Sequence, residues 1–550
     1  MKRKNLTVPS AVRRAAAAVG ALLCALAVGA LATTGTAAPG GAARDAAPAV
    51  DDARSVPVAA TETGLVCPTP AQLEQPDVGD DAFSAAPVAT TTTLTAAVLD
   101  GADGEQPAVT TLDGEQEAEL TGPLEQGTDA AVLDGRLPGA RVLRLTPGTA
   151  TYAAATVASV TTEGDLRGLV AGPCVEPAVE HWLVGGSTSV GSSGRLVLQN
   201  PGRTAATVTL QAWGASGPVV LGSQSLVVVP PGEQVVTMLE AVAPDQSRLA
   251  LRVTAEGGRV GAYVQHHRIE GLVPAGADLV VGGGAPSRTT AVSGVTSTGE
   301  TVDDPHAPRL DVLTPGTRAG TARLAVLGPD GPVRLRGGEE LPLEPGQVTT
   351  LPLGGLPAGS YTVVVDADVP VVAGAAVDRK GAAADDAVID EDPYDRAWLA
   401  GQAVAGQTGA EQTGAEQTGG TADGAVAVPE DAVYGVTLSG VPDERGPDEI
   451  EDATGSTEVT LRGVGPDGEV AWTHAVDVPA GQTVEVGWSE LEELGDAVAV
   501  VAEQPADQPE VVWSVRLVQA DDASLFSVLA PTPPLAADGD VRVRRVDAAG

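Results

Sequence analysis

The sequence has very little lysine, and its charge is of one sign. Beyond the first few residues the one lysine is Lys380, and 73 acidic side chains outnumber 32 basic ones, for a formal net charge of −41. Such a surface repels the phosphates of nucleic acids and disfavours docking on anionic lipid headgroups. We therefore expect no nucleic-acid partner. Solubility is the simpler explanation of the acidity, and low-affinity cation binding is the alternative.

Aromatic side chains are also scarce, at 2% of the 550 residues with six tryptophans. Carbohydrate sites usually stack sugar rings on aromatic side chains, so few are left for such a site. Trp213 and Trp472 fall on predicted strands, where core positions are expected. The 43% apolar content is mostly Ala, Val and Leu, and the chain has 68 Gly and 42 Pro. This composition favours short strands and many turns over long helices.

Long apolar runs are absent after residue 32. The one such run, Ala15–Ala32, follows a basic start and precedes small residues, which is typical of an export signal. Its 18 residues would span about 27 Å as a helix, close to the ~30 Å hydrocarbon core. Residues 1–35 are thus either a cleaved signal peptide or a retained membrane anchor. The positive-inside rule places the rest of the chain outside the cell. Leu23 before Cys24 argues against lipidation.

Only three cysteines are present, and Cys67 and Cys174 are the two beyond the export segment. Each adjoins a proline in a predicted turn. In an exported protein such a pair favours one disulfide, here closing a loop of about 107 residues. The alternative is two buried free thiols.

What the sequence has in abundance is repetition. The stretch Arg195–Val219 recurs at Arg309–Val333, with every Arg-Leu, Pro-Gly and Gly-Pro-Val at an offset of 114. A looser third copy starts at Thr457. The phrases WLVGG, LVVGG and WLAGQ, starting at residues 182, 279 and 398, are interpreted as an opening strand and turn of each copy.

The repeated phrase alternates β-branched residues between Pro-Gly and Asp-Gly turns, which predicts hairpins. We expect an all-β fold of tandem immunoglobulin-like antiparallel β-sandwich domains after the N-terminal signal or anchor helix. The predicted divisions are 36–82, a low-complexity or disordered segment; 83–173, an N-terminal β domain; 174–276, 277–395 and 396–535, repeats 1, 2 and 3, the last with a low-complexity insertion at 405–425; and 536–550, a tail.

Motifs of known chemistry are missing. The stretch His181–Gly194 has glycines at phosphate-loop spacing, but Ser192 stands where lysine is needed, so it is interpreted as a strand and turn. His266, His267 and Glu270 are the nearest approach to a metal cluster, yet neighbouring histidines on a strand point to opposite faces. The acidic runs Asp385–Asp395 and Asp443–Asp452 lack the register of a calcium loop and are interpreted as solvated loops. We therefore assign no catalytic, cofactor-binding or metal residue and expect no cofactor.

The segment from Pro173 to Val219, with GDLRGLVAGPC before it and AWLAG after it, resembles an actinobacterial exported family, domain of unknown function 5719. The resemblance covers roughly residues 67–535. It implies a signal-anchored, all-β, envelope-facing protein encoded beside a large membrane glycosyltransferase, and it transfers no catalytic residue.

We accordingly expect a non-enzymatic exported cell-envelope protein that serves as a scaffold or partner-binding module. Its partner would be an unknown envelope protein or glycan, and it would meet the membrane through the N-terminal segment if that is uncleaved. The alternatives are a glycan- or polymer-binding accessory factor for a membrane glycosyltransferase, and a hydrolase whose site the sequence does not reveal.

Overall fold

The computed structural model describes twelve stretches of the chain: 53–58, 62–73, 90–101, 106–121, 130–137, 139–335, 340–383, 391–404, 423–442, 453–505, 508–535 and 539–544. The predicted signal or anchor at 1–35, nearly all of the insertion at 405–425 and the acidic run at 443–452 lie outside them. The chain divides into a large unit, 57–539, and a small one formed by 1–56 with 540–550. In the small unit, β1 (Ala53–Val58) pairs with β36 (Gly539–Arg544).

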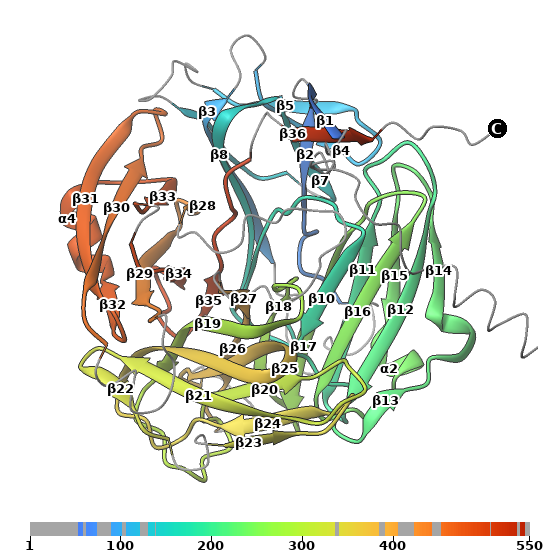
Figure 1. The fold of residues 1–550 in the computed structure, drawn as a ribbon, viewed down its shortest axis with the longest axis vertical. Coiled ribbons are helices and arrows are strands. Elements are labelled where there is room, and N and C mark those ends of the chain that lie inside the picture. Colours follow the sequence, from blue (N-terminus) through green and yellow to red (C-terminus); the bar gives the residue numbers. More distant parts are fainter. Residues whose placement is uncertain are drawn as a thin grey trace, which may run out of the picture. The chain divides into compact units, whose positions relative to one another are not determined.

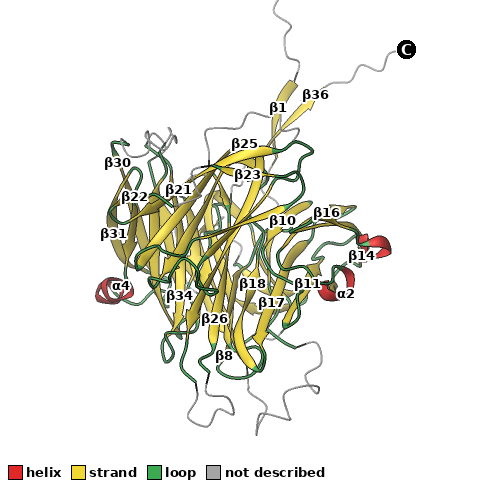
Figure 2. Cartoon of the chain, turned by 90° about the horizontal axis from the view of Figure 1, so that it is seen from below, coloured by secondary structure: helices red, strands yellow, loops and turns green. Residues whose placement is uncertain are grey.

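The large unit is all-β and built from antiparallel sheets, as expected (Figures 1 and 2). Four successive segments each contribute two groups of paired strands, and one group of repeat 1 is continuous with both groups of repeat 2 in a single 13-stranded sheet. The N-terminal domain pairs β2-β7-β4-β5 and β6-β3-β8-β9. Its strands are β2 (Thr63–Cys67), β3 (Thr91–Gly101), β4 (Ala108–Thr111), β5 (Gln116–Glu119), β6 (Ala130–Gly135), β7 (Arg141–Leu145), β8 (Pro147–Thr161) and β9 (Gly168–Pro173).

Repeat 1 has the same strand order as the N-terminal domain. Its strands pair as β10-β16-β12-β13, where β14 also pairs with β12, and as β15-β11-β17-β18. Alternating Val and Leu side chains of the two sheets meet in one apolar core. Its elements are β10 (Glu180–Val184), β11 (Ser192–Gln199), β12 (Ala206–Gly214), β13 (Gly217–Val219), η2 (Gly222–Ser225), β14 (Leu226–Val229), β15 (Gln234–Met238), α2 (Leu239–Val242), β16 (Leu249–Glu256), β17 (Gly261–Glu270) and β18 (Val273–Val280).

Repeat 2 joins its two sheets through one long strand, β25. The first part of β25 pairs with β19 and β21, and its last part pairs with β20 and β26. The elements are β19 (Ser287–Ser297), β20 (Arg309–Leu313), β21 (Gly320–Gly328), β22 (Gly331–Val333), β23 (Leu341–Leu343), β24 (Val348–Pro352), β25 (Gly359–Lys380), β26 (Tyr394–Ala400) and β27 (Gln402–Ala403).

Repeat 3 forms the sheets β28-β33-β30-β31 and β32-β29-β34-β35. Its elements are β28 (Gly424–Ala427), β29 (Ala432–Gly440), β30 (Ser456–Val464), β31 (Val470–Pro479), β32 (Thr483–Val486), α4 (Trp488–Leu494), β33 (Ala499–Glu503), β34 (Val511–Gln519) and β35 (Phe526–Leu529). None of the helices in the described residues is long and apolar enough to cross a membrane.

The sequence repeat is a structural repeat. Strands β12 and β21, β13 and β22, and β15 and β24 all begin 114 residues apart. The Pro-Gly turns agree as well, since Gly232 and Gly346 have φ of 72° and 70°. L-residues seldom adopt this conformation, which explains the glycine at both positions.

The interpretation of the opening phrases is wrong for two of the three. WLVGG does lie on the first strand of repeat 1, β10, which is followed by a turn at Gly185 and Gly186. LVVGG instead ends β18, which pairs with β17, and WLAGQ ends β26, which pairs with β25. Both phrases therefore complete the preceding repeat. The predicted boundaries at 276/277 and 395/396 fall inside these two strands.

The N-terminal domain starts earlier than expected. Strand β2 falls within 36–82, a segment expected to be disordered, yet it pairs with β7 over Thr63–Cys67. The alternating pattern that identified later strands is too short to identify β2, and its position depends on pairing with residues 141–145.

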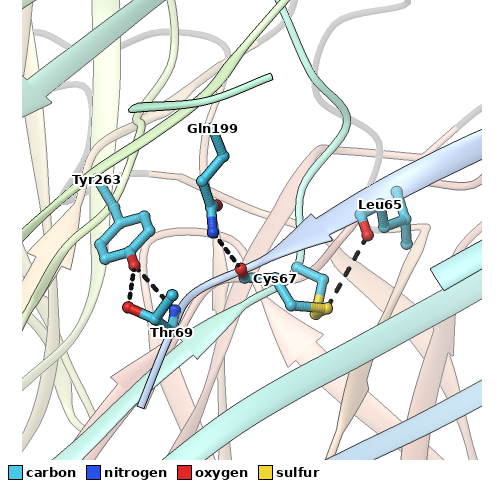
Figure 3. The surroundings of a disulfide bond; sticks show 6 residues. Leu65, Cys67, Thr69, Gln199 and Tyr263 are labelled. Carbon is cyan, nitrogen blue, oxygen red and sulfur yellow. Dashed lines mark hydrogen bonds between the residues drawn. A yellow bond between two sulfur atoms is a disulfide. The ribbon is translucent and has the colours of Figure 1, made fainter. Parts of the chain in front are cut away.

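Cys67 and Cys174 form a disulfide, the pairing that the sequence predicts. It joins the end of β2 to the residue after β9, and both side chains are buried. Figure 3 shows its surroundings: Gln199 Nε2 donates to the Cys67 carbonyl oxygen at 3.1 Å, and Tyr263 Oη lies 2.8 Å from the Thr69 backbone nitrogen. The Cys67 sulfur is 3.9 Å from the Leu65 carbonyl oxygen, a contact only, because a disulfide sulfur carries no proton.

Replacing Cys67 and Cys174 by alanine should lower the free energy of unfolding by about 2–4 kcal/mol, because the disulfide restricts the unfolded chain. Chemical denaturation followed by tryptophan fluorescence measures this. Wild-type protein treated with a reductant is the matched control and should unfold like the double variant. Equal stability of oxidised wild type and double variant would contradict the expectation.

Candidate functional site at the junction of the inner strands

One strand near the end of each domain lies at a common junction. Strands β9, β18, β26 and β35 come from the N-terminal domain and repeats 1, 2 and 3, and they pack against one another. Strands β18 and β26 also form a parallel bridge between Ala275 and Tyr394. Figure 1 shows β18, β26 and β35 near the middle of the large unit. We call this the inner-strand junction.

Close approach of backbones at the junction requires glycine. A Cβ on Gly276, whose φ is +102°, would lie 2.5 Å from the backbone nitrogen and the Cβ of Arg396. A Cβ on Gly168 would lie 2.6 Å from Asp395 Oδ1 and 2.8 Å from the carbonyl oxygen of Ala277. Real Cβ atoms do not approach neighbours so closely, so these two glycines allow β9, β18 and β26 to meet.

Asp278 on β18 binds the other three inner strands. Its Oδ1 accepts from the Ala171 N–H of β9 at 3.2 Å, and its Oδ2 accepts from the Trp398 N–H of β26 at 3.0 Å. The Ser527 hydroxyl of β35 lies 3.1 and 3.2 Å from the two carboxylate oxygens. Burial raises the pKa of Asp278 well above its usual value, although the N–H donors lower it. One carboxyl group thus contacts all four domains.

Asp395 on β26 repeats this arrangement. Its Oδ2 accepts from the Leu169 N–H of β9 at 3.1 Å and from the Phe526 N–H of β35 at 2.8 Å. The side chain is fully buried, and this burial raises its pKa to about 7 against the opposing effect of the backbone donors. Asp395 closes the acidic run 385–395, whose sequence predicts a solvated loop. For this residue the prediction is wrong.

An ion-pair network adjoins the junction on repeat 2. The guanidinium of Arg396 forms two hydrogen bonds with the Asp378 carboxylate, at 2.6 and 2.7 Å, and both side chains are buried. His306 Nδ1 lies 3.0 Å from the same carboxylate, and its ring stacks on Tyr394. Burial acts to raise the pKa of Asp378, but the Arg396 charge and the hydrogen bonds outweigh it, so the pKa is lowered. The carboxylate therefore remains charged and paired.

The structure does not bring the candidate metal ligands together. His266 is fully buried with its ring edge-on to Trp398, and burial, reinforced by the charge of Arg396, lowers its pKa well below the usual value. His267 is the next residue along β17, and Glu270 pairs with Arg268. Within the described stretches no group of three His, Cys, Asp or Glu side chains could hold a metal ion.

Five of the six tryptophans are buried, and Trp488 at the start of α4 is 54% exposed. Trp213 and Trp472 are buried, as predicted, and Trp213 stacks on Trp182 with ring centroids 5.5 Å apart. Trp398 is also buried, and the guanidinium carbons of Arg309 and Arg396 lie 5.2 and 5.6 Å from its ring centroid. These rings are used for packing and do not form an exposed stacking platform.

A polar groove of about 870 Å³ lies between the N-terminal domain and two turns of repeat 1. Its walls include Asp113, Glu119 and Arg144 on one side and the turns at 201–203 and 231–232 on the other, and no lining residue is aromatic. The backbones nearly touch here, because a Cβ on Gly232 would lie 3.0 Å from the Cα of Asp113. The sequence does not predict this groove, because its walls come from segments far apart in the sequence that meet only in the folded chain.

A family model described as "Family of unknown function (DUF5719)" matches residues 132–489, more than half of the chain. No curated protein matches this chain. Among solved structures, "Crystal Structure of Thermotoga maritima 1070" is 19% identical over 22% of this chain and 98% of that one, with a TM-score of 0.17. An alpha-L-rhamnosidase of Streptomyces avermitilis complexed with L-rhamnose is 12% identical over 80% of this chain and 55% of that one, with a TM-score of 0.11. These scores are too low to support an argument.

Replacing Gly276 by alanine should destabilise the large unit by about 2–4 kcal/mol, because the added methyl group both overlaps Arg396 and occupies a disfavoured φ. Gly271→Ala is the matched control, since Gly271 has φ +64° but no neighbouring atom within 4 Å of the position that a Cβ would take. It should lose only about 1 kcal/mol of backbone strain. Thermal and urea unfolding compare the two, and equal losses would argue against a tight junction.

The raised pKa of Asp395 predicts a pH dependence. The folded state holds this proton up to about pH 7, whereas an unfolded aspartate releases it near pH 4. The contribution of Asp395 to stability should therefore fall by a few kcal/mol as pH rises from about 4 to about 7 and then stay constant, while Asp278, whose pKa is also raised, adds its own decrease in both proteins. In Asp395→Asn this part of the slope should be absent. Urea unfolding of both proteins across this range is the measurement, and parallel curves would refute the assignment.

Proposed function

We propose that this chain, which belongs to a family of unknown function (DUF5719), is a non-enzymatic exported protein of the cell envelope that acts as a rigid scaffold or partner-binding module. In this proposal its four paired-sheet domains are tandem immunoglobulin-like β-sandwiches outside the cell. They are either secreted or held by a single N-terminal membrane anchor.

The observation that carries the proposal is the use of polar groups at the inner-strand junction. Asp278 and Asp395 accept hydrogen bonds from backbone N–H groups of other domains, and Arg396 pairs with Asp378. The two carboxyl groups thereby join domains, while the Arg396–Asp378 pair lies within repeat 2 beside them. Buried polar groups with all their partners in place rigidify the structure around them. A stiff platform that presents loops and strand edges fits a scaffold.

Two further contacts join the first domain to the last. Arg167, just before β9, donates to Asp522 at 3.1 Å and to Ser524 at 2.7 Å. Beyond β35, Leu535 forms a reciprocal pair of backbone hydrogen bonds with Thr151 of β8, both at 2.8 Å. The disulfide on β2 adds a covalent restraint to the same first domain. In an extracellular setting without chaperones, such restraints support long-term persistence of the fold.

The second candidate function is a glycan- or polymer-binding accessory factor for a membrane glycosyltransferase. The feature that favours it is the polar groove, whose carboxylate, amide and guanidinium groups can bind hydroxyl groups. The lack of aromatic lining residues counts against strong sugar binding, so we rank it second.

The proposal is tested with the full chain, tagged at its C-terminus, in the source organism. We expect it in the envelope fraction, sensitive to protease added to intact cells, and co-purifying with a defined set of envelope proteins. The purified chain should release no reducing sugar from envelope polysaccharide. Recovery in the cytosol, or sugar release that a substitution in the chain abolishes, would overturn the proposal.

The matched variants separate the two candidates. Arg144→Ala alters the groove, while Arg323→Ala removes a guanidinium from β21, which does not line the groove. If polymer retention on affinity gels falls with the first substitution only, the accessory role replaces the scaffold. If neither substitution changes the set of co-purifying proteins or the retention of polymer, the scaffold proposal is retained.

A further inference from the structure

The outer edge of repeat 1 differs from the equivalent edges of the other domains. Among the described residues β14 pairs only with β12, so its other edge is open. Figure 1 shows β14 at the border of repeat 1. Along this edge Val220, Leu226 and Val228 are 90%, 58% and 56% exposed. Open apolar strand edges readily pair with another chain.

The repeats provide an internal comparison for this edge. Val228 lies opposite Thr207 of β12, and the residue 114 positions later in repeat 2 is Pro342. The corresponding edge strands of repeat 3 and the N-terminal domain carry Asp477 and Glu119. A charge or a proline at such a position prevents a further strand from adding. Three domains therefore carry a residue that blocks their edge, and repeat 1 carries an exposed valine.

The charge pattern also changes at this edge. No charged residue occurs from Thr204 to Gly232, although the chain as a whole carries a net charge of −41. A basic partner would need carboxylates around the strand edge to which it binds, and residues 204–232 have none. The edge instead fits another uncharged, apolar strand, and β14 is itself such a strand.

We propose that two copies of this chain associate through β14, each adding its edge antiparallel to the other. A two-fold axis makes such an interface self-complementary. Side chains alternate between the two faces of a sheet along each strand. A register that pairs even-numbered residues with even-numbered residues therefore places Leu226 and Val228 of both copies on one face of the joined sheet. The pairing uses the open edge of each copy, so the assembly ends at a dimer. The acidic surfaces elsewhere repel one another and oppose further association.

Sedimentation equilibrium of the full chain in mild detergent tests this proposal. The N-terminal segment is common to all variants, so differences between them report on β14. Val228→Asp and Val228→Pro copy the residues of repeats 3 and 2, and each should weaken dimerisation about 10-fold or more, since each opposes strand pairing. Val190→Asp, at a fully exposed valine on the turn before β11, is the matched control and should leave the dimer intact.

Two readouts distinguish strand pairing from other association. Amides of Leu226–Val229 should exchange more slowly at high protein concentration, while those of Leu341 and Leu343 should not change. Added salt should strengthen the dimer, because it screens repulsion between two acidic chains. The proposal is overturned if wild type is monomeric, if the control and the Val228 variants dissociate alike, if β14 exchange is independent of concentration, or if salt weakens the association.

Discussion

Two buried carboxyl groups hold this protein together. Asp278 and Asp395 lie on neighbouring inner strands, and between them they accept hydrogen bonds from the backbones or hydroxyls of all the other domains that meet at the junction. Each carboxyl group offers about four acceptor positions, more than a backbone carbonyl, so it can bind several strand ends that have no sheet partner at that point. Without it, buried N–H groups such as that of Phe526 would lose their acceptor, at a cost of about 1–3 kcal/mol each.

The junction also explains the small residues around it. Strands that converge from four domains cannot keep ordinary sheet spacing. Gly168 lets β9 approach the side chain of Asp395 and the backbone of Ala277, and Gly276 lets β18 approach Arg396. The neighbouring pair Arg396 and Asp378 is fully formed, with two hydrogen bonds, so its charges remain satisfied away from water. Apart from these groups, each repeat has its own apolar cluster.

Much of the fold is predictable because its information is local. Turn glycines such as Gly232 and Gly346 and the alternating strands around them specify hairpins within a few residues, and the offset of 114 then identifies a second copy. The disulfide is predictable too, because only two cysteines remain outside the segment predicted to direct export. By contrast, similar phrases such as WLVGG and LVVGG lie on a first and a last strand, since a short apolar strand does not encode its own pairing partner.

The sequence by itself determined that this is an acidic, all-β chain of repeated hairpins with one disulfide, because strand alternation, turn chemistry and composition act over short distances. Only the tertiary structure decided that Asp395 is an interior residue and not the end of a solvated loop, and that Asp278 belongs to the same junction. Their role depends on N–H groups more than 100 residues away in the chain, such as those of Ala171 and Phe526. No local pattern records such a distance, so the junction arises only when the four domains have folded against one another.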